Sequence, residues 1–155
     1  MEKIKFLIRN VEADWPPVKH ESLWGERNGD SFKLKNAPFF IDNVAFDDIV
    51  QIKKLDGDVF DIIKVINPSQ HSTIWIYIND DKDVSLILEA IKKLNCGVEG
   101  GAVDNYYSIN IPSSATLAKL YVLLDPYIGD ERIIIDYPCL KNTDLADVKS
   151  DETND

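Results

Sequence analysis

The pattern of apolar and polar positions changes character near residue 70. Before that point, apolar residues alternate with polar ones over short stretches, and turn-forming residues separate the stretches. After it, apolar residues recur twice at helical spacing, and runs rich in isoleucine and tyrosine flank both helical stretches. Short alternation is typical of half-buried strands, whereas the longer period is typical of amphipathic helices. The sequence therefore predicts an α+β chain with a β-rich first part and a mixed second part.

The second part is predicted to repeat one arrangement, strand, amphipathic helix, strand. The expected strands cover residues 73–78, 98–103, 106–111 and 132–137, and the expected helices cover residues 83–94 and 115–124. Each helix carries one apolar stripe that needs a sheet to lie on. The stripes are Val84, Ile87, Leu88, Ile91 and Leu94, and then Leu117, Leu120, Tyr121 and Leu124. This β-α-β-β-α-β order is typical of a ferredoxin-like unit.

The ends of both helices carry residues with capping or stopping character. Ser113 or Ser114 is expected to cap the second helix, because a serine hydroxyl accepts from the first free backbone N–H groups. Gly97 is expected to end the first helix, since glycine tolerates the left-handed backbone found there. Pro126 is expected to stop the second helix, because proline lacks the N–H that a helix interior needs.

Tight-turn signals dominate the first part. Asn28-Gly29 and Asp56-Gly57 each separate two alternating stretches, and such pairs favour β-hairpins. Several short strands without helical periodicity predict a small β barrel or a curled antiparallel sheet. Pro68 and the polar run after it predict a boundary. We expect a β-rich subdomain at residues 1–68, a ferredoxin-like subdomain at residues 72–140 and a disordered acidic tail at residues 142–155.

Net charge narrows the classes of partner. The 155 residues carry a net charge of -10, of which the twelve residues 144–155 contribute five acids and one base, or -4, leaving -6 for the body. A negative field of this kind repels nucleic acid and anionic lipid, and it attracts cationic protein surfaces. We expect a protein partner, and neither nucleic acid nor membrane.

Chain length indicates whether the protein can form its own core, and the cysteines indicate its cellular compartment. A chain of this length, 45% hydrophobic, can bury an independent core without metals or disulfides. Cys96 and Cys139 are far apart and lack neighbouring ligands, which favours reduced thiols. The apolar run after Met1 is short and interrupted by charges, unlike a signal peptide or a membrane span. We expect a soluble cytoplasmic protein without a cofactor.

Several short motifs together resemble a known family. They are L-W-G-E at residues 23–26, N-A-P-F-F at 36–40, F-D-D-I-V at 46–50, V-E-G-G at 98–101 and I-N-I-P at 109–112. Their order and spacing resemble an uncharacterised bacterial domain-of-unknown-function family, in which an L-W motif, an N-x-P-F segment and a G/D-D-x-V strand precede a ferredoxin-like half. The resemblance covers residues 23–137. The family has no assigned catalytic residues that could be carried over to this sequence. Small acidic proteins of this kind also resemble immunity proteins, by analogy alone.

No catalytic or metal-binding pattern stands out. His20 and His71 are the two histidines, and neither has a cysteine or a second histidine at ligand spacing. The chain contains no G-x-S-x-G elbow for a serine nucleophile. We therefore expect no metal, no catalytic residues and no enzymatic activity.

Aspartates form the candidate partner-binding residues. Asp80, Asp81 and Asp83 make the densest carboxylate cluster of the predicted folded body, but the segment lacks the glycine and the distal glutamate of a calcium loop. Acids at a helix start are favoured by capping and by the helix dipole. Asp56 and Asp58 flank a turn glycine, where turn geometry explains both. All five are predicted to pair with basic residues of a partner.

Five aromatic residues allow two interpretations. Trp24, Phe39, Phe40, Phe46 and Trp75 could line a ligand groove between the halves. Aromatic side chains dominate the buried area of small domains, so the core and the seam between the halves are the preferred place for them. Trp15, beside two prolines, is expected to be a lid on the core, because most tryptophans are largely buried.

These observations favour a binding protein over an enzyme. The preferred hypothesis is an immunity protein that neutralises a toxin by placing an acidic face in a basic cleft of that toxin. The alternative is a ferredoxin-like domain that senses a small molecule and associates with another copy through its sheet. In the first case the partner is a bacterial toxin domain, and in the second it is a metabolite.

Overall fold

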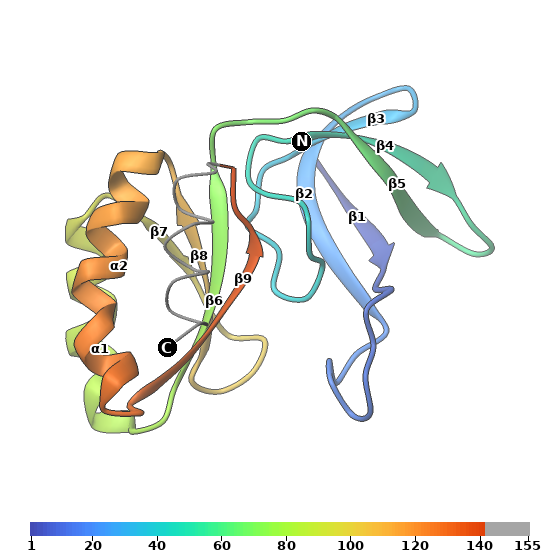
Figure 1. The fold of residues 1–155 in the computed structure, drawn as a ribbon. Coiled ribbons are helices and arrows are strands. Elements are labelled where there is room, and N and C mark those ends of the chain that lie inside the picture. The colour runs from blue at the N-terminus through green and yellow to red at the C-terminus, as the bar shows by residue number, and fades with distance from the viewer. Residues whose placement is uncertain (142–155) are drawn as a thin grey trace. The chain divides into compact units, whose positions relative to one another are not determined.

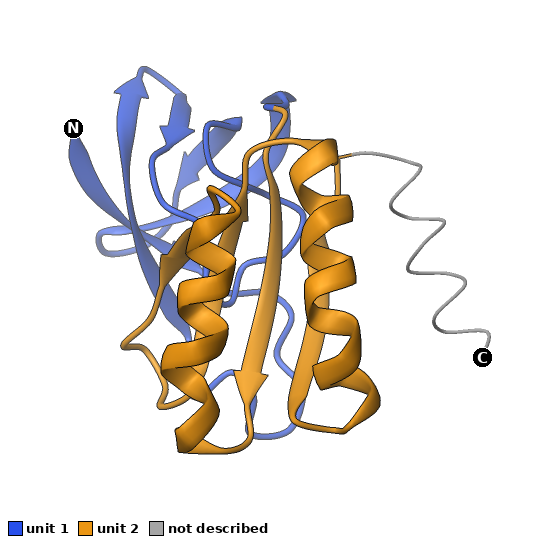
Figure 2. Cartoon of the chain, turned by 90° about the vertical axis from the view of Figure 1, so that its left-hand side faces the viewer, with its two compact units in different colours: residues 1–69 blue, residues 70–155 orange. Residues whose placement is uncertain are grey.

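The computed structural model describes residues 1–141 and divides the chain into two compact units, residues 1–69 and residues 70–155 (Figure 2). The predicted acidic tail, residues 142–155, lies outside the described residues. Unit 1 is entirely β and unit 2 is mixed, so the chain has the predicted α+β class. The two units are described in turn.

Unit 1 is a closed five-stranded barrel (Figure 1). Its strands are β1 (Glu2–Leu7), β2 (His20–Asn28), β3 (Ser31–Leu34), β4 (Ile49–Lys54) and β5 (Val59–Asn67). Consecutive strands pair antiparallel, as the hairpin signals predict. The closing pair, β1 with β5, is parallel, with Lys5 opposite Val59. The predicted curled antiparallel sheet is therefore present, and a parallel contact between its first and last strands closes it.

Alternation along the strands fills the barrel. In β2 the buried residues alternate with exposed ones, and the same period holds in β3. Phe6 and Phe32 meet inside, with ring centroids 5.5 Å apart. The remaining buried members of this core are Ile4, Leu23, Leu34, Val44, Val50, Ile52 and Phe60. The first hairpin turns at Gly29-Asp30, one residue later than expected, because Asn28 pairs with Ser31 and Gly29 takes the positive φ of 60°.

Unit 2 is a four-stranded antiparallel sheet with two helices on one face (Figure 2). Its elements are β6 (Ser72–Ile78), the short 3-10 helix η1 (Asp81–Asp83), α1 (Val84–Lys93), β7 (Gly97–Glu99), β8 (Tyr106–Ile111), α2 (Ser114–Gly129) and β9 (Ile133–Cys139). The spatial order of strands is β7-β8-β6-β9. The predicted order of strands and helices along the chain is therefore present.

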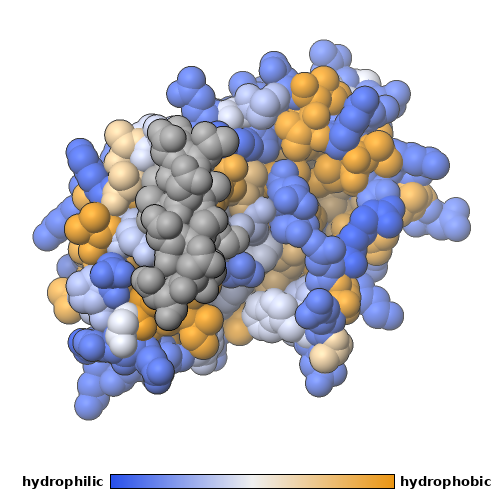
Figure 3. Space-filling view, viewed as in Figure 1, coloured by the Kyte–Doolittle hydropathy of each residue, from blue (hydrophilic) through white to orange (hydrophobic). Residues whose placement is uncertain are grey.

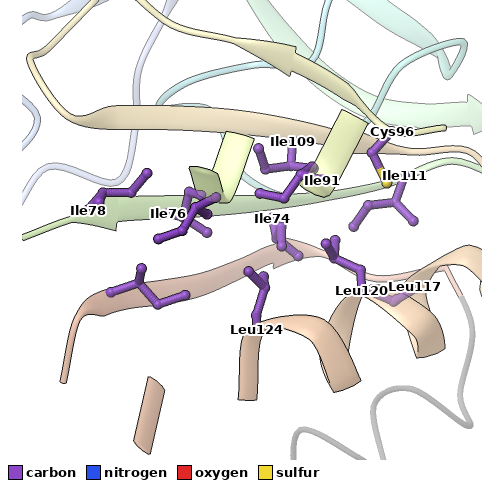
Figure 4. Close-up of a cluster of buried hydrophobic side chains, with 12 residues drawn as sticks. Ile74, Ile76, Ile78, Ile91, Cys96, Ile109, Ile111, Leu117, Leu120 and Leu124 are labelled. Carbon is purple, nitrogen blue, oxygen red and sulfur yellow. The ribbon is translucent and has the colours of Figure 1, made fainter. Parts of the chain in front are cut away.

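The core of unit 2 lies between the sheet and the helices (Figure 4). Isoleucines at every second position of β6 and β8 face the helical stripes, and Figure 4 shows them pointing toward leucines of α2. Its fully or nearly buried members are Ile74, Ile76, Ile78, Ile87, Ile91, Cys96, Ile109, Ile111, Leu117, Leu120, Leu124 and Ile133. Eight of the nine predicted stripe residues belong to this core or pack against it.

Two expected helix ends differ in the structure. Asn95, with a φ of 66°, takes the left-handed position after α1, and Gly97 instead begins β7. Helix α2 continues through Pro126 to Gly129. Proline removes one donor in the last turn, but its carbonyl still accepts from the Asp130 N–H at 3.1 Å. A single missing bond so near the end does not stop the helix.

The two outer strands of unit 2 are unequal. β7 contains three residues, Gly97–Glu99. β9 contains seven, including Pro138, and the Asp136 carboxylate accepts the backbone N–H of Tyr137 at 2.8 Å. Pro138 has no N–H to offer.

Candidate functional site

Three loops meet at one end of the unit 2 sheet. The last residue of β6 is held to the loop before β8, because the Ile78 N–H donates to the Asn105 carbonyl at 2.9 Å. The connection after β6 is held to the loop before β9 by the Asn79 N–H, which donates to the Arg132 carbonyl at 3.0 Å. These loops carry five exposed acids, Asp80, Asp81, Asp104, Asp130 and Glu131. We call this group the acidic end.

Side-chain hydrogen bonds fix parts of the acidic end. Asp80 accepts the Lys82 N–H at 3.0 Å and caps η1, as the helix-start pattern predicts. Asp81 accepts from the Asn105 amide at 2.7 Å, and the Asn79 amide donates to the Glu131 carbonyl at 2.7 Å. The three loops are therefore cross-linked by side chains and by backbone, which holds their carboxylates in a defined arrangement.

Asp83 differs from the other two aspartates of the predicted cluster. Its side chain is buried, and its two oxygens accept from the Arg132 guanidinium at 3.0 and 2.6 Å. Hydrogen bonding to Asp83 raises the pKa of Arg132, and the Coulombic attraction of the same carboxylate adds to the shift. Asp83 thus neutralises Arg132 and joins the start of α1 to the start of β9, while Asp80 and Asp81 remain exposed.

An open hollow of about 610 Å³ lies in this region. Its lining is Asn79, Asp80, Asp81, Lys82, Asp83, Glu131 and Arg132. The lining is dominated by charged and amide groups, so it suits hydrogen bonding and ion pairing with another polar surface. Within residues 1–141, no group of three or more histidine, cysteine, aspartate or glutamate side chains is arranged to hold a metal ion.

Asp56 and Asp58, also predicted to contact a partner, belong to unit 1. Both are exposed in the turn between β4 and β5, on either side of Gly57, whose φ is 70°. The five predicted aspartates therefore fall on two units, and three of them come together in unit 2.

The histidines have ordinary surroundings. His71 Nδ1 lies 2.9 Å from the Asn110 side-chain oxygen, and His20 is exposed at the first residue of β2.

Glu21 and Asp48 are buried carboxylates of unit 1 that the sequence analysis did not single out. Glu21 accepts the backbone N–H groups of Phe39, Phe40 and Ile41 at 2.5, 3.0 and 3.3 Å. Asp48 is completely buried and accepts the N–H groups of Ala45 and Ser69 at 2.9 and 2.8 Å. Both order irregular backbone of unit 1. The available signal was that Glu21 lies two residues before Leu23, on the inward-facing side of a predicted strand.

The aromatic residues do not all lie in the core. Phe40 and Trp75 are buried, and Phe39 and Phe46 are half-buried. Trp24, however, is 44% exposed, because the alternation of β2 turns its side chain outward. The prediction of a core position was wrong for Trp24. Trp15 packs edge-on against Phe40, with ring centroids 5.6 Å apart, yet remains 45% exposed.

Exposed apolar side chains occur on both units, and Figure 3 shows such groups among the hydrophilic residues of one face. Among the described helices, none combines the length and apolar character that crossing a membrane requires.

Comparisons with known proteins give two matches without an assigned activity. A family model described as a domain of unknown function (DUF4265) matches residues 21–134. A crystal structure described as that of a hypothetical protein from Neisseria gonorrhoeae is similar over 90% of this chain and 96% of that chain, with 26% sequence identity and a TM-score of 0.74. The comparison with curated proteins finds no match.

Proposed function

The chain belongs to the family described as a domain of unknown function (DUF4265), and from this premise we propose that it is a non-enzymatic bacterial protein-binding domain. In this proposal the acidic end of unit 2 docks in a basic cleft of a protein partner. The partner is a toxin domain, which the chain neutralises in the manner of an immunity protein.

The observation that carries the proposal is the concentration of exposed carboxylates on three cross-linked loops. The acidic end presents five acids, while Asp83 and Arg132 cancel each other and Lys82 is the remaining base of the hollow. Such a field accelerates encounter with a cationic surface and fixes its orientation. Because the loops are already held by hydrogen bonds, little conformational entropy is lost when they bind.

We also propose that unit 2 is a ferredoxin-like unit. The order β6-α1-β7-β8-α2-β9 along the chain and the order β7-β8-β6-β9 across the antiparallel sheet support it.

A sensor of small molecules is the second candidate. The open hollow beside the first strand-to-helix connection favours it, since the exposed Lys82 ammonium can meet an anionic group of a metabolite there. A thermal-shift screen separates the two candidates, because a ligand that binds the folded state raises the melting temperature by mass action. A metabolite that raises it, and loses this effect with Lys82→Gln, would support the sensor.

The docking proposal is tested by capture and then by affinity. Wild-type protein and the variant Asp80→Asn, Asp81→Asn, Asp130→Asn are used to capture partners from the native host, and a captured protein is then titrated by calorimetry. The asparagine side-chain oxygens can still accept the hydrogen bonds of the loops, while the three substitutions remove three negative charges. We expect the variant to bind at least about tenfold more weakly, with the difference shrinking as salt is raised.

A matched control removes three exposed charges elsewhere. Glu12→Gln, Glu89→Gln and Asp125→Asn change the net charge by the same amount and lie outside the acidic end. This variant is expected to bind like wild type. Equal recovery of every captured protein by all three forms would overturn the assignment of the acidic end.

A further inference from the structure

Trp24 has a position that the packing of the barrel does not explain. Leu23 points into the core and is 1% exposed. Gly25 also faces inward, where an added Cβ would lie 2.4 Å from the Phe32 ring. Between them Trp24 points outward and is 44% exposed. The core thus accounts for the leucine and the glycine of the L-W-G segment, but a tryptophan between them needs another reason.

Cations and aromatic rings alternate across the outer face of the barrel at this point. The Lys3 ammonium of β1 lies 5.8 Å from the Trp24 ring centroid. On the other side of Trp24 is Lys35, whose backbone N–H donates to the Trp24 carbonyl at 2.8 Å. The Lys35 ammonium lies 5.5 Å from the Phe46 ring centroid. We call these four residues the cation–aromatic row.

Further lysines extend the positive charge of this face. Lys5 lies on β1 two residues from Lys3 and opposite Ser22 of β2. Lys33 lies on β3 opposite Glu26 of β2. The Lys35 ammonium forms an ion pair with the Asp47 carboxylate at 2.6 Å. Four lysines and two acids give this face a charge of +2. Unit 1 as a whole has ten basic and twelve acidic residues, or -2, so the face is basic within an acidic unit.

We propose that the cation–aromatic row is a second interaction surface, which binds an acidic peptide segment of a protein partner. Carboxylates of the segment pair with Lys3, Lys5 and Lys33, and an apolar or aromatic side chain packs on the exposed ring of Trp24. Tryptophan is among the residues most enriched in binding hot spots. Since the whole chain carries -10, a short acidic segment is favoured over the dense, extended charge of nucleic acid. This surface lies on unit 1 and is independent of the acidic end.

Fluorescence anisotropy with three labelled probes tests the proposal on the full chain. The probes are a decapeptide of alternating glutamate and tyrosine, the same peptide with glutamine for glutamate, and a ten-nucleotide oligothymidylate. We expect the acidic peptide to bind, with at least about tenfold tighter affinity than the glutamine peptide, and to weaken as salt rises from low to physiological. Trp24→Ala should weaken binding at least about tenfold.

Charge variants locate the surface. Lys3→Gln, Lys5→Gln and Lys33→Gln together are expected to abolish the preference for the acidic peptide. The control Lys53→Gln, Lys54→Gln and Lys64→Gln removes three exposed charges from β4 and β5 and should bind like wild type. Equal effects of both triple variants, tighter binding of the oligothymidylate, or salt-independent binding by wild type would each overturn the proposal. The last measurement stands even if a variant fails to fold.

Discussion

Arg132 holds both carboxylate oxygens of Asp83, at 3.0 and 2.6 Å, across 49 residues of sequence. The aspartate ends η1 and directly precedes α1, and the arginine directly precedes β9. This one pair therefore connects the two helix-bearing halves of unit 2 beside the acidic end.

Removing Arg132 should destabilise the fold more than removing Asp83 and Arg132 together. Arg132→Ala leaves a buried carboxylate without its partner, whereas Arg132→Ala with Asp83→Leu leaves none. We expect the single variant to lower the melting temperature by at least about 4 °C and the double variant to recover part of that loss. Thermal unfolding followed by circular dichroism measures both. A double variant whose melting temperature falls below that of Arg132→Ala would contradict this account.

Gly25 is expected to tolerate no side chain. In Gly25→Ala the added Cβ meets the Phe32 ring at 2.4 Å and the Lys33 carbonyl oxygen at 2.3 Å, so the barrel must shift. We expect this overpacking to lower the free energy of unfolding by about 1–3 kcal/mol. Urea denaturation of Gly25→Ala and wild type measures the loss.

Gly129→Ala is the control for that substitution. No atom lies within 4 Å of a Cβ built there, at the end of α2. Stability should be unchanged or increased by up to about 1 kcal/mol. Equal losses in the two variants would show that the Phe32 contact is not the cause.

Asp48 should stabilise the fold because its carboxylate oxygens accept hydrogen bonds, and not because it carries a charge. Asp48→Ala leaves the Ala45 and Ser69 N–H groups without their acceptor and is expected to cost about 2 kcal/mol or more of unfolding free energy. Asp48→Asn retains one side-chain oxygen and should cost less. Chemical denaturation of the two variants checks the order, and a reversed order would refute it.

The Ser113 hydroxyl should be the cap of α2. It accepts the Thr116 N–H at 3.2 Å, so Ser113→Ala is expected to cost about 1 kcal/mol, and Ser113→Asp to restore most of it. The neighbouring Ser114→Ala, in the first turn of the helix, should be close to neutral. Urea denaturation of the three variants distinguishes the two serines.

The Cys96 thiol should resist alkylation in the folded protein. Burial raises the pKa of Cys96 from 9.0 to about 11, because the apolar core disfavours the thiolate. At pH 8, iodoacetamide should modify Cys96 in urea but not in buffer, as peptide mass spectrometry can show. The stability that this burial contributes is complete below pH 9 and is lost as the pH rises to about 11.

The spacing of apolar residues predicted most strands and both long helices. A strand buries every second residue, whereas a helix buries residues three or four positions apart. β8, at Tyr106–Ile111, matches its predicted range, and Ser113 caps α2 as expected. The parallel pairing of β1 with β5 was not predicted, since no local signal marks contacts between strands so distant in the chain. Helix α2 continues past Pro126 because the Pro126 carbonyl still accepts from the Asp130 N–H.

The candidate site was predicted in part. The sequence pointed to Asp80 and Asp81, but Asp104, Asp130 and Glu131 joined them only when folding brought three loops together. The ion pair of Asp83 with Arg132 was likewise invisible, because opposite charges 49 residues apart carry no spacing signal. Trp24 was assigned to the core from residue type alone, and the alternation of β2 overruled that assignment.

The outer strands of unit 2 have a consequence for its behaviour at high concentration. A fibril grows when a sheet border offers an incoming chain a continuous ladder of free amides. β7 is too short to provide such a ladder, and β9 interrupts its own with the Asp136 carboxylate on the Tyr137 N–H and with Pro138. Replacing Asp136 and Pro138 would restore the template, and the isoleucine-rich strand would then promote amyloid-like assembly.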